Sequence, residues 1–283
     1  MGRPFEQTTV AGLTVTAWPV SRRGAVPTVL GLPGLSSTSR VWTWLAEELP
    51  GHRVISPDLR GRGGSHALPG PTGQRAHAKD VAAIATELDL RDVILVGHSM
   101  GAFLAPLVAQ EVGDRVQRLV LIDGGPRPAL PPIMTPALAR LSFRIELTKL
   151  DKEYPTIEAF VDRFGTKYIR NRPDLRPLLI ETLAHDLVRT ANGFRPVIDI
   201  PRAIADAVDC FFNPEVQQGL LDLTVPAHIV AATAGKGDKA KAFLADKVID
   251  GAVRQVRTLT AERVTSNHLT ILFTPEVIKA VSG

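Results

Sequence analysis

A serine flanked by glycines is the strongest chemical signal in this chain. Residues Gly97–Gly101 read G-x-S-x-G with Ser99 at the centre. The motif follows the apolar run Val93–Val96 and opens a stretch with helical character at Met100. A sharp turn between a strand and a helix strains the serine backbone, exposes its hydroxyl and sets the positive helix end beneath it. The pattern predicts that Ser99 is a nucleophile.

A serine hydroxyl needs a base to become an effective nucleophile. Among the seven histidines, His268 stands in a loop after the last expected strand and before the last expected helix. Such a loop projects over the same sheet edge as Ser99, so we expect His268 to be the general base. His98 adjoins the serine, and we expect the turn to direct its ring elsewhere.

A third group should hold the imidazole in the correct tautomer and stabilise its charged form. Two aspartates follow strands on the expected edge and keep the chain order serine, acid, histidine. Asp123 ends one strand directly, whereas Asp238 follows the next strand by way of a short loop. We prefer Asp238 as the acid and keep Asp123 as the alternative.

A tetrahedral intermediate also requires donors for its oxyanion. The backbone N–H of Met100, directly after the nucleophile, is the first candidate. The second is the backbone N–H of Leu35, in the loop after an early strand.

Short apolar runs alternate with helical patterns through much of the chain, which predicts an α/β fold with a mostly parallel, doubly wound sheet. The expected hairpin covers residues 7–20, and the expected strands cover 28–32, 54–56, 93–96, 118–122, 227–232 and 253–259. The expected helices cover 41–49, 79–90 and 100–112, and a closing helix starts at residue 275.

The alternation of strand and helix patterns stops in the middle of the chain, where prolines are frequent and no strand alternation is visible. We therefore expect a core domain from residues 1–126 and 224–283, interrupted by a helical insertion at 127–223.

Composition, charge and the length of apolar runs restrict the kinds of protein that this chain can be. The 283 residues are 45% hydrophobic and 22% charged, as in a globular protein. The net charge is +4, but the basic residues form no block, so we expect no nucleic-acid partner. Cys210, the single cysteine, lies in an apolar run and is expected to be a buried hydrophobe. No apolar run has membrane-spanning length and no secretory signal is visible, so we expect a cytoplasmic protein.

Together these motifs resemble the α/β-hydrolase superfamily along nearly the whole chain. The matching segments are Gly31–Leu35 with Trp42 downstream, the D-x-R-G-x-G-x-S element at Asp58–Ser65, the serine motif, the strand end at Asp123, and Asn267-His268. The resemblance implies that the insertion is a cap over the pocket and that the Asp58 loop braces the serine turn.

Two departures from the family pattern concern the site. Pro33 stands where the family's oxyanion loop has histidine, and Asp238 falls later after its strand than the family's acid does, which keeps Asp123 open. The serine at position 99 argues against epoxide hydrolases and haloalkane dehalogenases, which carry an aspartate nucleophile there.

The expected function is hydrolysis of a small to medium, moderately apolar ester or lactone, a small-molecule substrate, through an acyl-enzyme on Ser99. No phosphate loop, dinucleotide fingerprint or metal-ligand cluster is visible, so we expect no cofactor and no metal. Alternatives are a C–C bond hydrolase, a cofactor-free perhydrolase, or a non-catalytic protein that retains the pocket to bind a ligand. Apolar cap residues that could line the pocket are Ile133, Met134, Phe143, Phe160, Phe164, Phe211 and Phe212.

Overall fold

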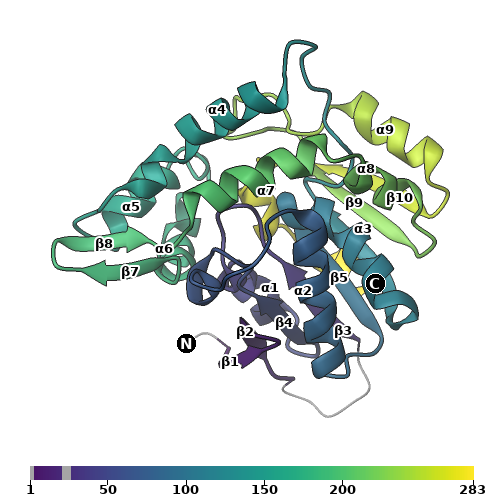
Figure 1. Cartoon of the computed structure of the whole chain (residues 1–283), viewed down its shortest axis with the longest axis horizontal. Coiled ribbons are helices and arrows are strands. Elements are labelled where there is room, and N and C mark those ends of the chain that lie inside the picture. The colour runs from purple at the N-terminus through teal and green to yellow at the C-terminus, as the bar shows by residue number, and fades with distance from the viewer. Residues whose placement is uncertain (1–2, 21–26) are drawn as a thin grey trace.

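The computed structural model describes residues 3–20 and 27–283. Within these ranges an eight-stranded sheet has the order β1-β2-β4-β3-β5-β6-β9-β10 (Figure 1). The strands are β1 (Glu6–Val10), β2 (Leu13–Trp18), β3 (Thr28–Leu32), β4 (Arg53–Pro57), β5 (Val93–His98), β6 (Val116–Ile122), β9 (Ala227–Ala232) and β10 (Leu259–Val264). The first two strands pair antiparallel, as the expected hairpin requires, and β2 also pairs antiparallel with β4. The other strands are parallel, so the predicted α/β-hydrolase fold class is confirmed.

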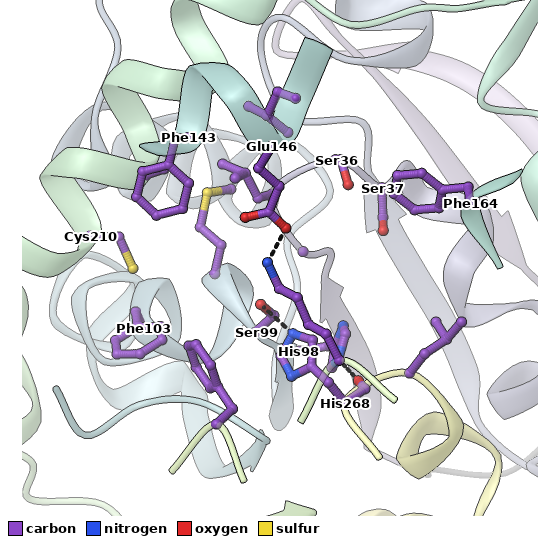
Figure 2. A pocket seen from close by; sticks show the side chains of 18 of the residues that line it. Ser36, Ser37, His98, Ser99, Phe103, Phe143, Glu146, Phe164, Cys210 and His268 are labelled. Atoms are coloured by element: carbon purple, nitrogen blue, oxygen red, sulfur yellow. Dashed lines mark hydrogen bonds and ion pairs between the residues drawn. The ribbon is translucent and has the colours of Figure 1, made fainter. Parts of the chain in front are cut away.

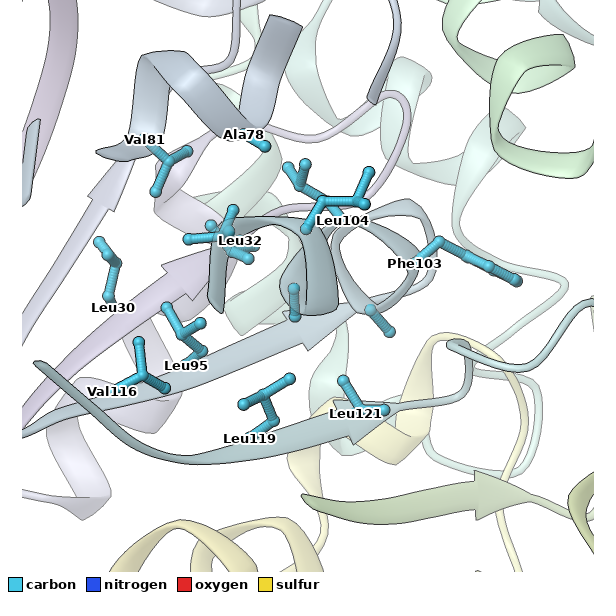
Figure 3. Packing of buried hydrophobic residues seen from close by; sticks show 14 of the residues in the cluster. Leu30, Leu32, Ala78, Val81, Leu95, Phe103, Leu104, Val116, Leu119 and Leu121 are labelled. Carbon is cyan, nitrogen blue, oxygen red and sulfur yellow. The ribbon is translucent and has the colours of Figure 1, made fainter. Parts of the chain in front are cut away.

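Helices cover both faces of the sheet because its central strands are apolar on both sides. Leu119 and Leu121 of β6 face one hydrophobic cluster, and Val120 and Ile122 face the other. Figure 3 shows the first cluster, where side chains from two helices meet those of the strands. The helices on this face are α2 (Gln74–Glu87), α3 (Met100–Val112) and α9 (Asp246–Gln255), and those on the other are α1 (Thr43–Glu48) and α10 (Pro275–Ser282).

The chain between β6 and β9 adds a second group of elements beyond the sheet (Figure 1). Its helices are α4 (Pro136–Leu147), α5 (Ile157–Phe164), α6 (Arg176–Ala184), α7 (Ile200–Phe212) and α8 (Pro214–Leu221). Helix α4 packs on α7, α5 packs on α6, and α8 packs against α3 of the core. Short 3-10 turns occur at Ser39–Trp42, Gly63–Ser65, Gly113–Arg115, Thr148–Asp151, Pro173–Leu175 and Thr270–Phe273.

Two details differ from the sequence expectations. The segment between β6 and β9 is not wholly helical, because β7 (Leu187–Thr190) and β8 (Gly193–Pro196) form an antiparallel hairpin. The strand expected at residues 253–259 is also wrong. There α9 continues to Gln255, with Ile249 and Ala252 buried at helical spacing, and β10 starts only at Leu259. No helix in the described ranges is long and apolar enough to cross a membrane.

Candidate active site

The turn that carries Ser99 is forced by its neighbours. Strand β5 ends at His98 and α3 starts at Met100, which leaves Ser99 alone between them with a φ of +52°. A Cβ atom on Gly97 would lie 2.2 Å from the carbonyl oxygen of Gly101. A Cβ on Gly101 would lie 2.0 Å from the carbonyl oxygen of Leu32. Both positions therefore require glycine, and the strand–turn–helix geometry is the predicted one.

The structure brings Ser99 and His268 together although 169 positions separate them. The Nε2 atom of His268 lies 3.0 Å from the Ser99 hydroxyl oxygen (Figure 2). The backbone of His268 is held on both sides: its N–H donates to Gly235 and its carbonyl accepts from His98 Nε2 at 2.8 Å. The His98 ring therefore turns away from the hydroxyl, as expected, and supports the histidine loop.

Asp123 completes this hydrogen-bonded series. Its Oδ2 atom lies 2.5 Å from Nδ1 of His268, and the residue is fully buried. Its other carboxylate oxygen accepts the N–H of Ala232 on the neighbouring strand at 3.1 Å, which fixes the side chain's rotation. With Nδ1–H donating to the carboxylate, Nε2 is left as the acceptor for the Ser99 O–H.

The preference for Asp238 is corrected by this geometry. Asp238 lies at the exposed tip of a turn in which the Gly235 N–H donates to the Ala240 carbonyl. Its Oδ1 accepts from Nδ2 of Asn267 at 2.7 Å, not from His268. Asn267 in turn accepts the N–H groups of Leu269 and Thr270. Asp238 therefore supports the loop that carries His268, while the alternative, Asp123, is the carboxylate beside the imidazole.

His98 is buried next to a group that could acquire positive charge. Burial, and secondly the nearby His268, lowers the pKa of His98 to about 3. The His98 ring is consequently neutral at physiological pH, so it adds no repulsion when His268 takes up a proton.

The two expected oxyanion donors belong to residues beside Ser99. Leu35 and Met100 line the same cavity as Ser99 and His268. A Cβ on Gly34 would stand 3.6 Å from the Ser99 Cβ, so the Leu35 loop passes close to the serine. The Arg62 Nε–H donates to the Leu35 carbonyl at 2.9 Å and holds this loop, although Pro33 replaces the family's histidine.

A cavity of about 150 Å³ opens over Ser99 (Figure 2). Of the seven apolar candidates, Phe143, Phe164 and Phe211 line it. Met134 and Phe212 line a second pocket, Phe160 lies in a separate hydrophobic cluster, and Ile133 is 76% exposed. Cys210 is buried at the cavity, and burial raises the pKa of its thiol, as suits a hydrophobe. Lining residues that the sequence did not suggest include Phe103, Glu146, Leu147, Lys149, Tyr168, Lys236, Phe243 and Leu269.

No cluster of three or more potential metal ligands occurs in the described part of the chain.

Sequence reasoning also missed a buried ionic contact between the core and the inserted helices. Arg62, in the loop after β4, donates to Asp206 of α7 at 2.5 Å, and His77 Nε2 lies 3.0 Å from the same carboxylate. Burial alone would raise the pKa of Asp206, but His77 and Arg62 lower it to about 2. The Asp58 carboxylate accepts the N–H groups of Ser39 and Gly64, so its side chain ties its own loop to the segment after β3 and not to the serine turn that the resemblance implied.

Replacing Arg62 tests this contact. The Arg62 and Asp206 side chains are 1% and 0% exposed, so Arg62→Met leaves a buried carboxylate with one cation fewer. We expect the free energy of unfolding to fall by about 3 kcal/mol, measured by urea denaturation. Arg91→Met is the control, because its ion pair with Asp89 is 69% and 76% exposed and its loss should cost less than about 0.5 kcal/mol. Equal effects of the two substitutions would contradict the prediction.

Comparison with known proteins identifies the family of this chain. Residues 27–164 match the sequence profile described as the alpha/beta hydrolase fold. N-formylmaleamate deformylase from Pseudomonas putida is 36% identical over 209 residues, which span 72% of this chain and 69% of that protein.

Solved structures show the same fold at lower identity. E-2-(acetamidomethylene)succinate hydrolase has a TM-score of 0.80 at 22% identity and covers 99% of this chain and 98% of its own. The enol-lactonase from Burkholderia xenovorans LB400 has a TM-score of 0.70 at 17% identity and covers 98% of this chain and 100% of its own. The profile, the relative and the shared fold lead to one conclusion: this chain belongs to the alpha/beta hydrolase family.

Proposed function

We propose that this protein is a serine hydrolase that forms an acyl-enzyme on Ser99. The observation that carries the proposal is the hydrogen-bonded series from Asp123 through His268 to the Ser99 hydroxyl, at the wall of a largely apolar cavity. Base, orienting carboxylate and nucleophile have the relative positions that acyl transfer requires.

In the first step the Ser99 Oγ attacks the carbonyl carbon of the substrate. His268 Nε2 takes the hydroxyl proton, and the carbonyl π electrons move to the oxygen. The backbone N–H groups of Leu35 and Met100 are proposed to donate to this oxyanion. Loss of one such donor typically costs about 2.7–4 kcal/mol of transition-state stabilisation.

In the second step the tetrahedral intermediate collapses. The bond to the leaving oxygen breaks, and that oxygen receives the proton held by His268 Nε2. A water molecule then attacks the acyl-enzyme, with His268 again taking and returning a proton. Asp123 stabilises the imidazolium in both half-reactions.

The cavity supports a small to medium, moderately apolar ester or lactone as substrate. Phe143 and Phe211 come from α4 and α7 and stack with ring centroids 5.8 Å apart. Phe243 packs 5.0 Å from the His268 ring, between centroids, and limits its contact with water. We also propose that residues 127–223 act as the cap and that residues 1–126 and 224–283 form the core domain.

A second candidate reaction is hydrolysis of an acyl amide by the same residues. The similarity to N-formylmaleamate deformylase favours it. Chemically it differs only in the leaving atom, since His268 would protonate a nitrogen in place of an oxygen.

A fluorophosphonate probe tests the proposal directly. An activated Ser99 should be labelled to one equivalent, with the adduct on the peptide that contains residue 99, whereas a non-catalytic ligand-binding protein should stay unlabelled. A panel of p-nitrophenyl esters, lactones and N-formyl amides then distinguishes the two reactions. Absence of labelling, together with no turnover in the panel, would refute the proposed function.

A further inference from the structure

An ion pair stands in the cavity wall, outside the hydrogen-bonded series at Ser99. The Lys236 ammonium, from the loop after β9, donates to Glu146 of α4. Both residues line the cavity together with Ser99 and His268. Figure 2 shows the Glu146 carboxylate pointing into the pocket, with its contact to the lysine ammonium drawn as a dashed line.

The surroundings of Glu146 contain more positive than negative charge. Lys149 also lines the cavity, and Lys167 is close enough to influence both Glu146 and Lys149. Burial alone would raise the pKa of Glu146, but Lys236, Lys149 and Lys167 lower it below its ordinary value. The pKa of Lys149 is lowered by burial and then by Lys167. Lys236 contacts the Glu146 carboxylate, Lys149 and Lys167 add positive charge near it, and a second anion would therefore be stabilised there.

Another part of the cavity wall is apolar instead of charged. Phe103, Phe143 and Phe211 form an apolar side close to Ser99. A ligand that suits both parts has an apolar body and one anionic end.

The Lys236 ammonium can leave Glu146 for another carboxylate at a small cost in free energy. The Lys236 and Glu146 side chains are 44% and 33% exposed, so water and salt screen their attraction. A lysine side chain is flexible and its ammonium can be shared between two carboxylates.

We propose that Lys236 is a specificity-determining residue that binds a free carboxylate of the substrate, and that Glu146 pairs with this ammonium when the pocket is empty. This inference rests on the proposed function and deepens it: the substrate is an ester, lactone or amide that also carries a carboxylate.

Matched pairs of esters test the proposal. Mono-p-nitrophenyl adipate and p-nitrophenyl hexanoate differ only in a terminal carboxylate on the acyl side. The butyrate esters of 3-hydroxybenzoate and phenol place the same difference on the leaving group. The measured quantity is the selectivity ratio, which is kcat/KM for the acid divided by kcat/KM for its neutral partner.

In at least one pair the wild-type ratio should exceed one, and Lys236→Met should lower it about 10-fold. Lys236→Arg should retain most of the ratio. Glu146→Gln should raise it, because the ammonium loses its competing partner. Lys239→Met is the charge-matched control: this lysine is exposed in the same loop and outside the cavity lining, so the ratio should stay at the wild-type value.

Ratios that agree within twofold between wild type and Lys236→Met in both pairs would overturn the inference while leaving the serine hydrolase intact. Failure of the proposed function would look different, with no turnover of any ester and no fluorophosphonate labelling. In that case, titrating Ser99→Ala and Ser99→Ala/Lys236→Met with mono-p-nitrophenyl adipate measures carboxylate binding without turnover. Equal dissociation constants for these two variants would then reject the role of Lys236.

Discussion

Replacing Ser99 with alanine is expected to lower kcat on the best ester about a million-fold, to the level left by binding and the oxyanion donors alone. The hydroxyl that accepts the acyl group is removed, and His268 Nε2 loses the partner that lies 3.0 Å away. Among the described residues that line the cavity, Ser99 alone is hydrogen-bonded to Nε2 of His268. The measurement is kcat under saturating p-nitrophenyl ester.

The fold should survive this substitution. Alanine has the same Cβ as serine, so the strain at a φ of +52° is unchanged, and the melting temperature should stay within a few degrees. Ser282→Ala, near the chain end in α10, is the matched control and should keep wild-type turnover. If Ser99→Ala folds normally and still hydrolyses esters at the wild-type rate, another group is the nucleophile.

The second large effect separates the two aspartates. Asp123→Asn is expected to lower kcat about 10,000-fold, because the amide can present an N–H to Nδ1 and hold His268 in the wrong tautomer. Asp238→Asn should lower kcat less than about 10-fold, because its partner is the Asn267 side chain and its effect on His268 is indirect. Both values of kcat come from the same ester assay at one fixed pH.

Melting curves serve as the control for this pair. Asp123 also accepts the Ala232 N–H inside the sheet, so Asp123→Asn variants must first be shown to fold. A collapse of kcat in Asp238→Asn, with Asp123→Asn close to wild type, would reverse the assignment. Equal and small losses in both would mean that neither carboxylate orients the imidazole.

The predicted helices and strands were accurate where a short stretch of sequence marks the element by itself. Helix α3 and strand β9 have the boundaries expected from the sequence, and the closing helix begins at Pro275 as expected. Each of these segments is marked by apolar runs with glycine or proline at its ends. The expected strand at 253–259 failed because Val253 and Val256 also fit the helical spacing set by Ile249 and Ala252.

The hairpin of β7 and β8 could have been recognised. The Asn192-Gly193 dipeptide is a turn signal, although in the structure Ala191 and Asn192 form the turn and Gly193, with a φ of +143°, already pairs with Thr190. The all-helical interpretation followed because no strand alternation is visible in this segment. The Arg62–Asp206 contact left no comparable signal, because its members are 144 positions apart and neither has a distinctive local context.

Sequence alone identified the serine turn, the alternation of strands and helices from β3 to β6, and Ser99 and His268 as candidate catalytic residues. Those features depend on glycine spacing, apolar periodicity and strand ends, all of which are short-range properties. Tertiary structure alone decided which aspartate lies beside His268 and which charges meet at the cavity. Both aspartates follow strands on one edge, but only the packing of β6 against β9 and the turn at Gly235 set their distances from the imidazole.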